Sequence, residues 1–209
     1  MKRACLAFVL SLTVFALLPQ LGAAAVPTVV VRPGHLHGWH PSSAGNPSYG
    51  RWDTGPDTAP LGQGSVHLRF ANKDRLQLGL GSVSSANFTG TFRVHGSGFA
   101  SFYVRGSGAS ATVTPNTGTA WRTVNAMSSS NWQWDCPGGT TPTGTGTFGA
   151  FRAACGSPNI TAVGFAAAVG TSWVDAATLG PAGNVKTYNF EPPTATIANA
   201  RLIEGNDGS

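Results

Sequence analysis

The stretch SVHLRF, residues 65–70, alternates apolar and polar side chains along its whole length. Val66, Leu68 and Phe70 occupy every second position, so an extended backbone would place them on one side and His67 on the other. Such alternation is typical of a β-strand that covers a hydrophobic core with one face and meets water with the other.

The same pattern recurs and predicts a fold built almost entirely of strands. RLQLGL (residues 75–80) and TFRVH (residues 91–95) repeat the alternation, and clusters of Gly, Ser, Asn and Pro separate the segments at hairpin-like intervals. Other strand-like segments are TVVVR (28–32), SFYVRG (101–106), SATVT (110–114), WRTVNAM (121–127), ITAVGFAAAV (160–169), SWVDAATL (172–179) and VKTYNFE (185–191). About ten short strands predict an all-β protein, an antiparallel two-sheet jelly-roll-like sandwich.

One segment breaks the strand pattern and predicts a single short helix. In TFGAFRAACGSPN, residues 147–159, Thr147 is a suitable N-cap. Phe148, Phe151 and Cys155 would share one helical face, and the glycine and proline that follow would end the helix.

The first 25 residues have the three parts of a secretory signal peptide. Lys2 and Arg3 form a charged start, an apolar run covers residues 4–18, and three alanines ending at Ala25 supply a cleavage site. A transmembrane helix is the alternative, but the apolar run is shorter than the roughly 20 residues that a bilayer requires. We therefore expect a secreted protein that meets a membrane only through its cleaved signal peptide.

The composition of the remaining chain excludes some partners. Charged residues make up 10% of the sequence, and the net charge of +5 falls to +3 without Lys2 and Arg3. The other basic residues are scattered, whereas a protein that follows nucleic-acid phosphates needs a basic stripe, so no nucleic acid is expected. A polar surface with few charges suits an extracellular β-protein.

Two cysteines remain after signal removal, Cys136 and Cys155. In an exported protein two thiols usually pair, and this bridge would fasten the loop expected in the CPGGTTPTGTGT run that starts at Cys136. Separate free or catalytic thiols are the alternative.

Four stretches, in their order along the chain, resemble a group of secreted bacterial, especially actinobacterial, β-sandwich domains of jelly-roll type. They are WDTGPDTAPLGQGSVHL, AWRTVNAMSSSNWQW, the expected helix before SPNITAVGF, and SWVDAATLG followed by VKTYNFE. Members of that group are similar to carbohydrate-binding modules, so the resemblance implies a sandwich domain over residues 26–191 and supplies no catalytic motif. The Gly- and Ser-rich stretch 87–115 departs from the group's pattern and leaves the register of the central strands open.

The tail over residues 192–209 contains a second resemblance. IANARLIEGNDGS resembles the opening strand of a Calx-β domain, in which Glu204 and Asp207 match an acidic turn that binds calcium in many members. A whole domain needs on the order of 100 residues, so we expect the start of a truncated Calx-β domain or a fragment of a longer surface protein. A frayed polar tail is the alternative. One strand alone would not form a calcium site.

The segment GHLHGWH, residues 34–40, collects three of the five histidines. In an extended backbone His35 and His37 would point to one face, which makes them weak metal-ligand candidates. Zinc needs three or four ligands and calcium needs oxygens, so no metal and no cofactor is expected. The simpler interpretation is a polar strand end, with Trp39 packed over the edge of the sandwich.

Tryptophan faces and neighbouring amides indicate where a sugar would bind. In NWQWDC, Trp132 and Trp134 would share one face about 7 Å apart, a spacing that suits neighbouring sugar rings. The same alternation could instead place both indoles in the core. The candidate ligand-binding residues of this segment are Asn131, Trp132, Gln133, Trp134 and Asp135. A second, weaker group lies in and beside a loop expected over residues 41–62, namely Trp39, Tyr49 and Trp52.

Catalysis has little support in the sequence. Glycoside hydrolysis needs two carboxylates about 5–9.5 Å apart, and no strand carries an acidic pair of the kind expected. There is also no G-x-S-x-G nucleophile elbow. We expect a secreted, non-catalytic binding module for polysaccharide or a cell-surface glycan, within a larger extracellular protein. The alternatives are a structural or adhesive spacer without a small ligand, and a glycan-acting hydrolase with unrecognised carboxylates.

Overall fold

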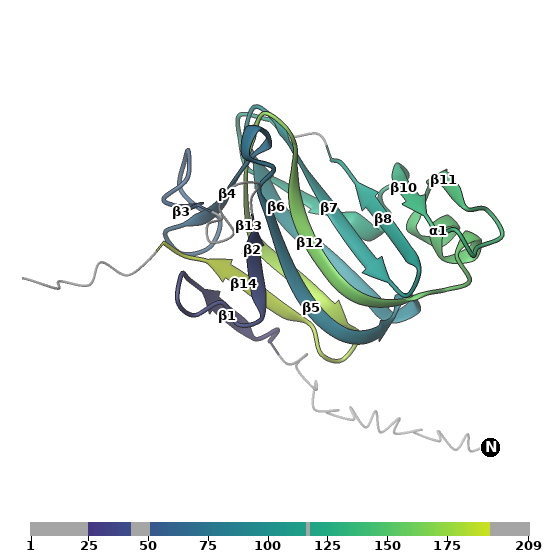
Figure 1. Cartoon of the computed structure of the whole chain (residues 1–209). Helices are drawn as coiled ribbons and strands as arrows, with labels where there is room; N and C mark the ends of the chain where they lie inside the picture. Colours follow the sequence, from purple (N-terminus) through teal and green to yellow (C-terminus); the bar gives the residue numbers. More distant parts are fainter. Residues whose placement is uncertain (1–24, 43–50, 116–117, 193–209) are drawn as a thin grey trace, which may run out of the picture.

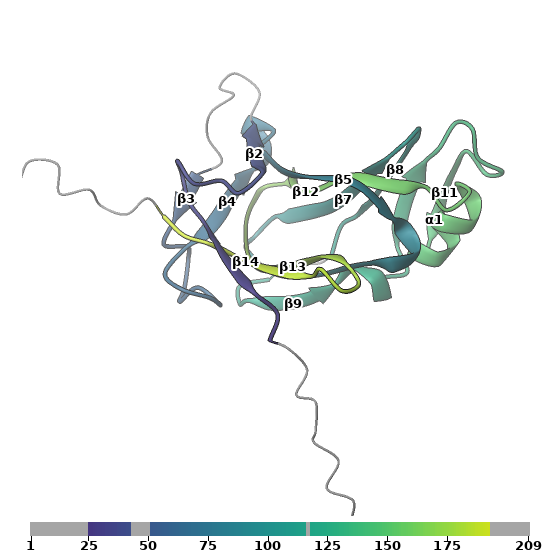
Figure 2. The same ribbon diagram turned by 90° about the horizontal axis from the view of Figure 1, so that it is seen from below.

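The protein is a β-sandwich of two packed sheets. Its structure is a computed structural model that describes residues 25–42, 51–115 and 118–192 (Figure 1). Figure 2 shows the sandwich from its edge, with β5, β7, β8 and β12 in one layer and β9, β13 and β14 in the other. The predicted all-β sandwich with one short helix is confirmed. Tyr49, Glu204, Asp207 and residues 1–24 of the expected signal peptide lie outside the described residues.

Sheet I is organised around one long strand. Its described strands are β1 (Thr28–Val31), β3 (Arg51–Asp53), β4 (Ser65–Arg69), β6 (Phe88–His95), β9 (Arg122–Asn125), β13 (Thr171–Pro181) and β14 (Lys186–Phe190). β6 pairs with one edge of β13, and β9 lies beyond β6. On the other edge, β4 pairs with the first half of β13 and β14 with the second half. A register shift between Asp175 and Thr178 separates these two halves.

Sheet II is a continuous seven-stranded layer. In spatial order its described strands are β11 (Thr143–Gly146), β10 (Trp132–Asp135), β8 (Ala109–Val113), β7 (Phe99–Gly106), β12 (Asn159–Val169), β5 (Arg75–Ser84) and β2 (Trp39–Ser42). All of these neighbours are antiparallel, whereas β1 and β14 of sheet I pair in parallel. β11 lies inside the CPGGTTPTGTGT run, and β3 lies inside residues 41–62, so both expected loops contain a short strand.

The apolar positions of the alternating segments form the core between the sheets. Val66, Leu68, Phe92 and Val94 are fully buried, as their spacing predicts. Phe70 is an exception, since 53% of it is exposed. The expectation that it continues the buried face of β4 is wrong because the strand ends at Arg69 and Phe70 begins a short 3-10 turn.

The predicted helix is present as α1 (Phe148–Ala154), and its cap is the expected one. The side chain of Thr147 accepts a hydrogen bond from the backbone N–H of Ala150 at 3.1 Å. Phe148 and Phe151 are buried against the end of the core. In the described part of the chain, no helix is long and apolar enough to cross a membrane.

The predicted disulfide between Cys136 and Cys155 is confirmed, with the two Cα atoms 5.7 Å apart. Cys136 directly follows β10, and Cys155 directly follows α1. The bridge therefore closes β11 and α1 into one loop at the end of the sandwich.

Removal of this disulfide should destabilise the fold measurably. The bridge closes a loop of sequence separation 19, for which the loop-entropy model gives roughly 3 kcal/mol. We expect the variant Cys136→Ser/Cys155→Ser to lose about that much unfolding free energy in chemical denaturation. Wild-type protein with reductant should match the variant, and the variant should not respond to reductant. Identical denaturation midpoints for oxidised wild type and variant would contradict the stabilising role.

Candidate binding face

The segment NWQWDC forms β10 with the predicted alternation, but its tryptophans point into the core. Trp132 has no exposed surface and Trp134 has 9%. The indole N–H of Trp132 donates to the backbone oxygen of Ala126 at 2.8 Å, and that of Trp134 donates to Thr141 O at 3.2 Å. The exposed platform of two indoles is therefore not formed. The Trp132 ring packs against Phe148 of α1 and Phe102 of β7. The Trp134 ring lies against the glycines of β11. The core alternative describes both side chains.

The polar residues of the same segment face outward. Gln133 and Asp135 alternate with the two tryptophans and are exposed on the outer face of sheet II, and Asn131 is exposed just before the strand. The side-chain N–H of Asn131 donates to the backbone oxygen of Thr114 at 3.4 Å. Three of the five candidates from this segment thus remain accessible to a ligand.

The early-loop group does not assemble as expected. Trp39 is fully buried in β2 and stacks on Phe165 with ring centres 6.0 Å apart. Trp52, in β3, is half-buried against Phe190. Trp39 therefore cannot offer its ring to a ligand. Its burial agrees with the simpler interpretation of GHLHGWH, in which Trp39 packs against the sandwich and binds no ligand.

The outer face of sheet II is a broad polar surface. One row of cross-strand neighbours runs through all seven strands, because paired residues on adjacent strands share a face. From β11 to β2 the row is Thr145, Gln133, Thr112, Tyr103, Gly164, Gln77 and His40. We call this outer surface, together with its neighbouring residues Arg75, Ser101, Arg105, Ser110 and Ala166, the polar face of sheet II. Hydroxyl, amide and guanidinium groups dominate it.

Tyr103 lies flat across the middle of the polar face. A Cβ atom at Gly164 would be only 2.6 Å from the Tyr103 hydroxyl oxygen, so the ring needs a glycine beneath it. The hydroxyl donates to the side-chain oxygen of Gln77, two strands away, at 3.3 Å. Burial raises the pKa of Tyr103, although the charges of Arg105 and Arg75 act in the opposite direction. These contacts hold the Tyr103 ring in place on the outer surface of the sheet.

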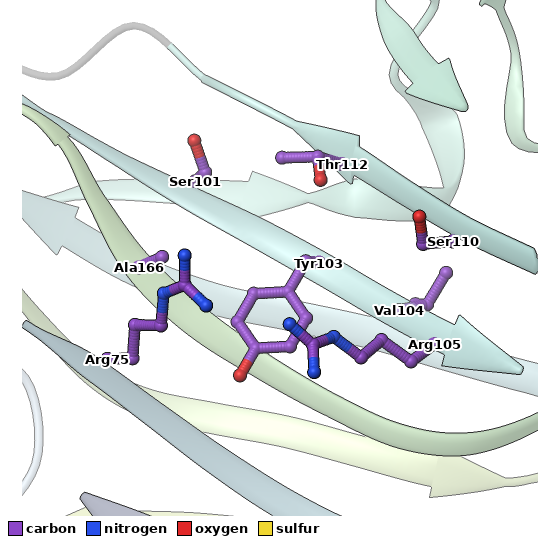
Figure 3. A pocket seen from close by; sticks show the side chains of 8 residues that line it. All are labelled: Arg75, Ser101, Tyr103, Val104, Arg105, Ser110, Thr112 and Ala166. Atoms are coloured by element: carbon purple, nitrogen blue, oxygen red, sulfur yellow. The ribbon is translucent and has the colours of Figure 1, made fainter. Parts of the chain in front are cut away.

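An open depression of about 260 Å³ lies over this ring (Figure 3). Its walls carry Arg75 on one side and Arg105 on the other, and the Arg105 guanidinium carbon is 5.4 Å from the centre of the Tyr103 ring. Ser101, Ser110 and Thr112 supply hydroxyl groups, and the Ser101 hydroxyl is 2.6 Å from that of Thr114. Such a lining suits a hydroxyl-rich or charged ligand better than an apolar one.

Sequence reasoning missed the centre of this face. SFYVRG was identified as a strand, yet Ser101, Tyr103 and Arg105 were not named as candidates. The signal was present in their period, because Ser101, Tyr103 and Arg105 occupy every second position and the apolar Phe102 and Val104 lie between them. A tyrosine on the outward side, between a serine and an arginine, was the available indication.

The histidine segment does not adopt the extended conformation that made His35 and His37 weak metal-ligand candidates. Residues 33–34 and 37–38 form turns, and His37 has a left-handed φ of 47°. His35 instead forms an isolated bridge with Arg32. Among residues 25–42, 51–115 and 118–192, no group of three or more His, Cys, Asp or Glu side chains is placed to hold a metal ion.

The other two histidines, His67 and His95, both contact Trp173 on the outer face of sheet I. His67 of β4 and His95 of β6 are both register partners of Trp173, because β13 lies between their strands. His67 stacks on the Trp173 ring at 4.5 Å, and His95 meets its edge at 6.0 Å. The sequence placed both histidines on outward positions but not beside one another.

Two aspartates contact the two histidines. Asp53 is the last residue of β3, and Asp57 lies in the segment that follows it. Asp53 lies 3.0 Å from His67 Nδ1 and accepts the indole N–H of Trp173 at 3.1 Å. Burial acts to raise the pKa of Asp53, but its hydrogen bonds and the charge of His67 outweigh burial and lower it. Asp57 lies 2.8 Å from His95 Nε2. These contacts hold residues 53–57 against sheet I.

A buried carboxylate pair anchors the next part of this segment. Asp175 accepts the backbone N–H groups of Leu61 at 3.0 Å and Phe190 at 3.1 Å. Glu191 accepts the N–H of Gln63 at 3.1 Å. Burial raises the pKa of Asp175 to about 7, the backbone donors oppose that rise, and the nearby Glu191 charge adds to it.

This carboxylate pair is the arrangement closest to the hydrolase alternative. Two acids with separated pKa values are typical of glycosidases, but structural networks perturb pKa values as well. Here Asp175 is fully buried, and Glu191 is 9% exposed. A Cβ atom at Gly62 would overlap the Glu191 carboxylate, which shows how closely the chain covers it. The geometry therefore fits a structural anchor for residues 61–63.

The protein is thus a jelly-roll-like β-sandwich with an open, polar outer surface on sheet II. On sheet I, side-chain contacts hold the segment of residues 53–63 in place. Comparison of the chain with protein-family models, with curated proteins and with solved structures gave no match. The resemblances to the secreted bacterial sandwich group and to Calx-β domains thus rest on the quoted residues alone.

Proposed function

We propose that this chain is a secreted, non-catalytic binding module that holds a polysaccharide on the polar face of sheet II. The observation that carries the proposal is the depression over Tyr103, which is lined by hydroxyl and guanidinium groups on a rigid sheet. Sugars present many hydroxyl groups, and outward side chains on neighbouring strands can contact them without any loop rearrangement. The disulfide between Cys136 and Cys155 suits a protein that works in an oxidising compartment.

The extent of the polar face of sheet II favours a polysaccharide ligand over a single sugar. Gln133 and Asp135 lie on β10, two strands from Tyr103 and Arg105, and His40 lies on the opposite edge strand. The row covers six strand spacings of about 4.8 Å, so it crosses about 29 Å of the sheet. A polysaccharide would contact the central depression and these flanking groups together.

The experiment compares retention of variants on insoluble polysaccharides. Tyr103→Ala should lower the affinity about tenfold or more, which corresponds to ~1.4 kcal/mol, because it removes the floor of the depression. Ala166→Trp should have a similar effect for the opposite reason, since the indole would fill the depression without removing any polar group. Arg122→Ala is the control, because Arg122 is exposed on β9 of the other sheet.

Each variant is checked for native unfolding temperature before its retention is interpreted. Full retention of both Tyr103→Ala and Ala166→Trp would overturn the proposed site. Absence of retention of the wild type on every polysaccharide tested would overturn the proposed function.

The second candidate is a structural or adhesive spacer domain without a small ligand. The burial of Trp39, Trp132 and Trp134 favours it, because these indoles serve the core. A spacer would show no polysaccharide retention and no response to either variant on sheet II.

A further inference from the structure

The depression on sheet II has an unbalanced positive charge. Arg75 comes from β5 and Arg105 from β7, and Figure 3 shows them on either side of the Tyr103 ring. None of the residues that line the depression is an aspartate or glutamate. Within the described part of the chain, neither guanidinium forms an ion pair, since the three pairs found there involve His67, Arg69 and His95.

The sheet register keeps carboxylates away from these two arginines. Asp135 shares a cross-strand row with Arg105, but Ser110 of β8 stands between them. Two strand spacings amount to about 9.6 Å, so Asp135 does not neutralise the depression. Asp74 precedes Arg75 in sequence, but it is buried, and its carboxylate lies 3.4 Å from Arg69 Nε.

We propose that the polar face of sheet II selects an anionic polysaccharide, whose carboxylate or sulfate groups bind between Arg75 and Arg105. This inference rests on the proposed function and names its substrate class. A guanidinium presents a planar fork of N–H donors that matches the oxygens of a carboxylate or sulfate. The Ser101 hydroxyl is paired with that of Thr114, so Ser110 and Thr112 remain for the neutral hydroxyl groups of the same sugar.

The two arginines have different roles in this arrangement. Arg105 lies over the Tyr103 ring, so its position is fixed by a cation–π contact before the ligand arrives. Arg75 lies on the other wall and is exposed, so it can close onto the bound anion. Preorganisation of one donor lowers the ordering cost of binding.

The test uses polysaccharide pairs that share a backbone and differ in charge. Polygalacturonate is compared with its methyl ester, and dextran sulfate with dextran, by isothermal titration with residues 26–209. We expect the charged member of at least one pair to bind about tenfold tighter, with an affinity that falls as salt rises. The pair that shows the difference identifies carboxylate or sulfate as the preferred group.

Arginine variants then assign the preference to the depression. Arg75→Gln and Arg105→Gln should each weaken binding of the charged member severalfold, and the double variant should bind both members of the pair equally. Arg122→Gln, on the opposite sheet, is the matched control and should leave the preference unchanged. A charge preference that survives in the double variant would overturn the assignment to this site.

The remaining outcomes separate the inference from the proposed function. Equal binding of charged and neutral members by the wild type would overturn the anionic preference and leave polysaccharide binding intact. Binding to neither member of either pair, together with no retention on neutral insoluble polysaccharides, would overturn both.

Discussion

Replacement of Trp132 by alanine is expected to lower the free energy of unfolding by about 3–5 kcal/mol, the usual cost of deleting a large buried aromatic side chain. Trp132 is fully buried, and its ring lies 5.0 Å from that of Phe148 and 6.0 Å from that of Phe102. The variant would also leave the backbone oxygen of Ala126 without its indole donor. Chemical denaturation of both proteins measures this difference.

The neighbouring Gln133 provides a matched control in the same strand. Gln133→Ala removes an exposed side chain from the opposite face, so stability should change by less than about 0.5 kcal/mol. A Trp132→Ala variant that keeps wild-type stability would contradict the assignment of this indole to the core.

The second large effect is a loss of stability as the pH rises through the titration of Asp175. Its pKa is about 7 in the folded protein, against 3.8 for an unperturbed aspartate. Between these values the folded state holds a proton that the unfolded state has released, so unfolding becomes easier as pH rises. The slope reaches up to about 1.4 kcal/mol per pH unit, and the whole window from about pH 4 to pH 7 approaches ~4 kcal/mol.

The variant Asp175→Asn isolates this contribution. Leu61 and Phe190 donate to different oxygens of Asp175, so an amide, which has one acceptor oxygen, keeps only one of these two hydrogen bonds. The amide does not titrate. We expect the wild type to be the more stable protein near pH 4, because both of its oxygens accept, and this advantage to shrink by up to ~4 kcal/mol as the pH rises toward 7. If wild type gains stability on the variant across this window, the backbone donors outweigh burial, and the assignment of the raised pKa is wrong.

The position of Asp175 explains why a carboxylate is retained at such a buried point. It lies where β13 changes partner from β4 to β14, beside Ala176, which has a positive φ of 49°. The two partner strands cannot satisfy every backbone N–H at this change, so the side chain accepts those of Leu61 and Phe190. The short alternating segments gave no indication of this split, because it depends on the pairing of distant strands.

Alternation predicted which residues share a face, but not always which face is buried. In the segments of Val66, Leu68, Phe92 and Val94 the alternate positions are polar. The apolar face was therefore also the buried face. In NWQWDC the apolar bodies of the indoles determined the buried side, and the amide and carboxylate side chains remained outside. The sequence therefore predicted the strand correctly, but only the fold showed which of its two faces is buried and which is exposed.

The candidate site itself depends on long-range pairing that a single sequence does not show. Arg75, Tyr103 and Thr112 lie on β5, β7 and β8, and β12 enters between β5 and β7 from much later in the chain. His67 and His95 likewise contact the same Trp173 ring only because β13 runs between β4 and β6. The Thr147 cap was predictable because its partner lies three residues away, and the disulfide because only Cys136 and Cys155 remain after the expected signal peptide.

An amide-resolved nuclear magnetic resonance titration of residues 26–209 with a soluble anionic oligosaccharide tests the central claim most directly. The account predicts that the largest shifts occur at Arg75, Tyr103, Arg105 and Thr112, with smaller ones at Gln133 and none at Trp173 or His67. Shifts concentrated around Trp173 and His67 on sheet I would contradict it, because the ligand would then bind the opposite face of the sandwich.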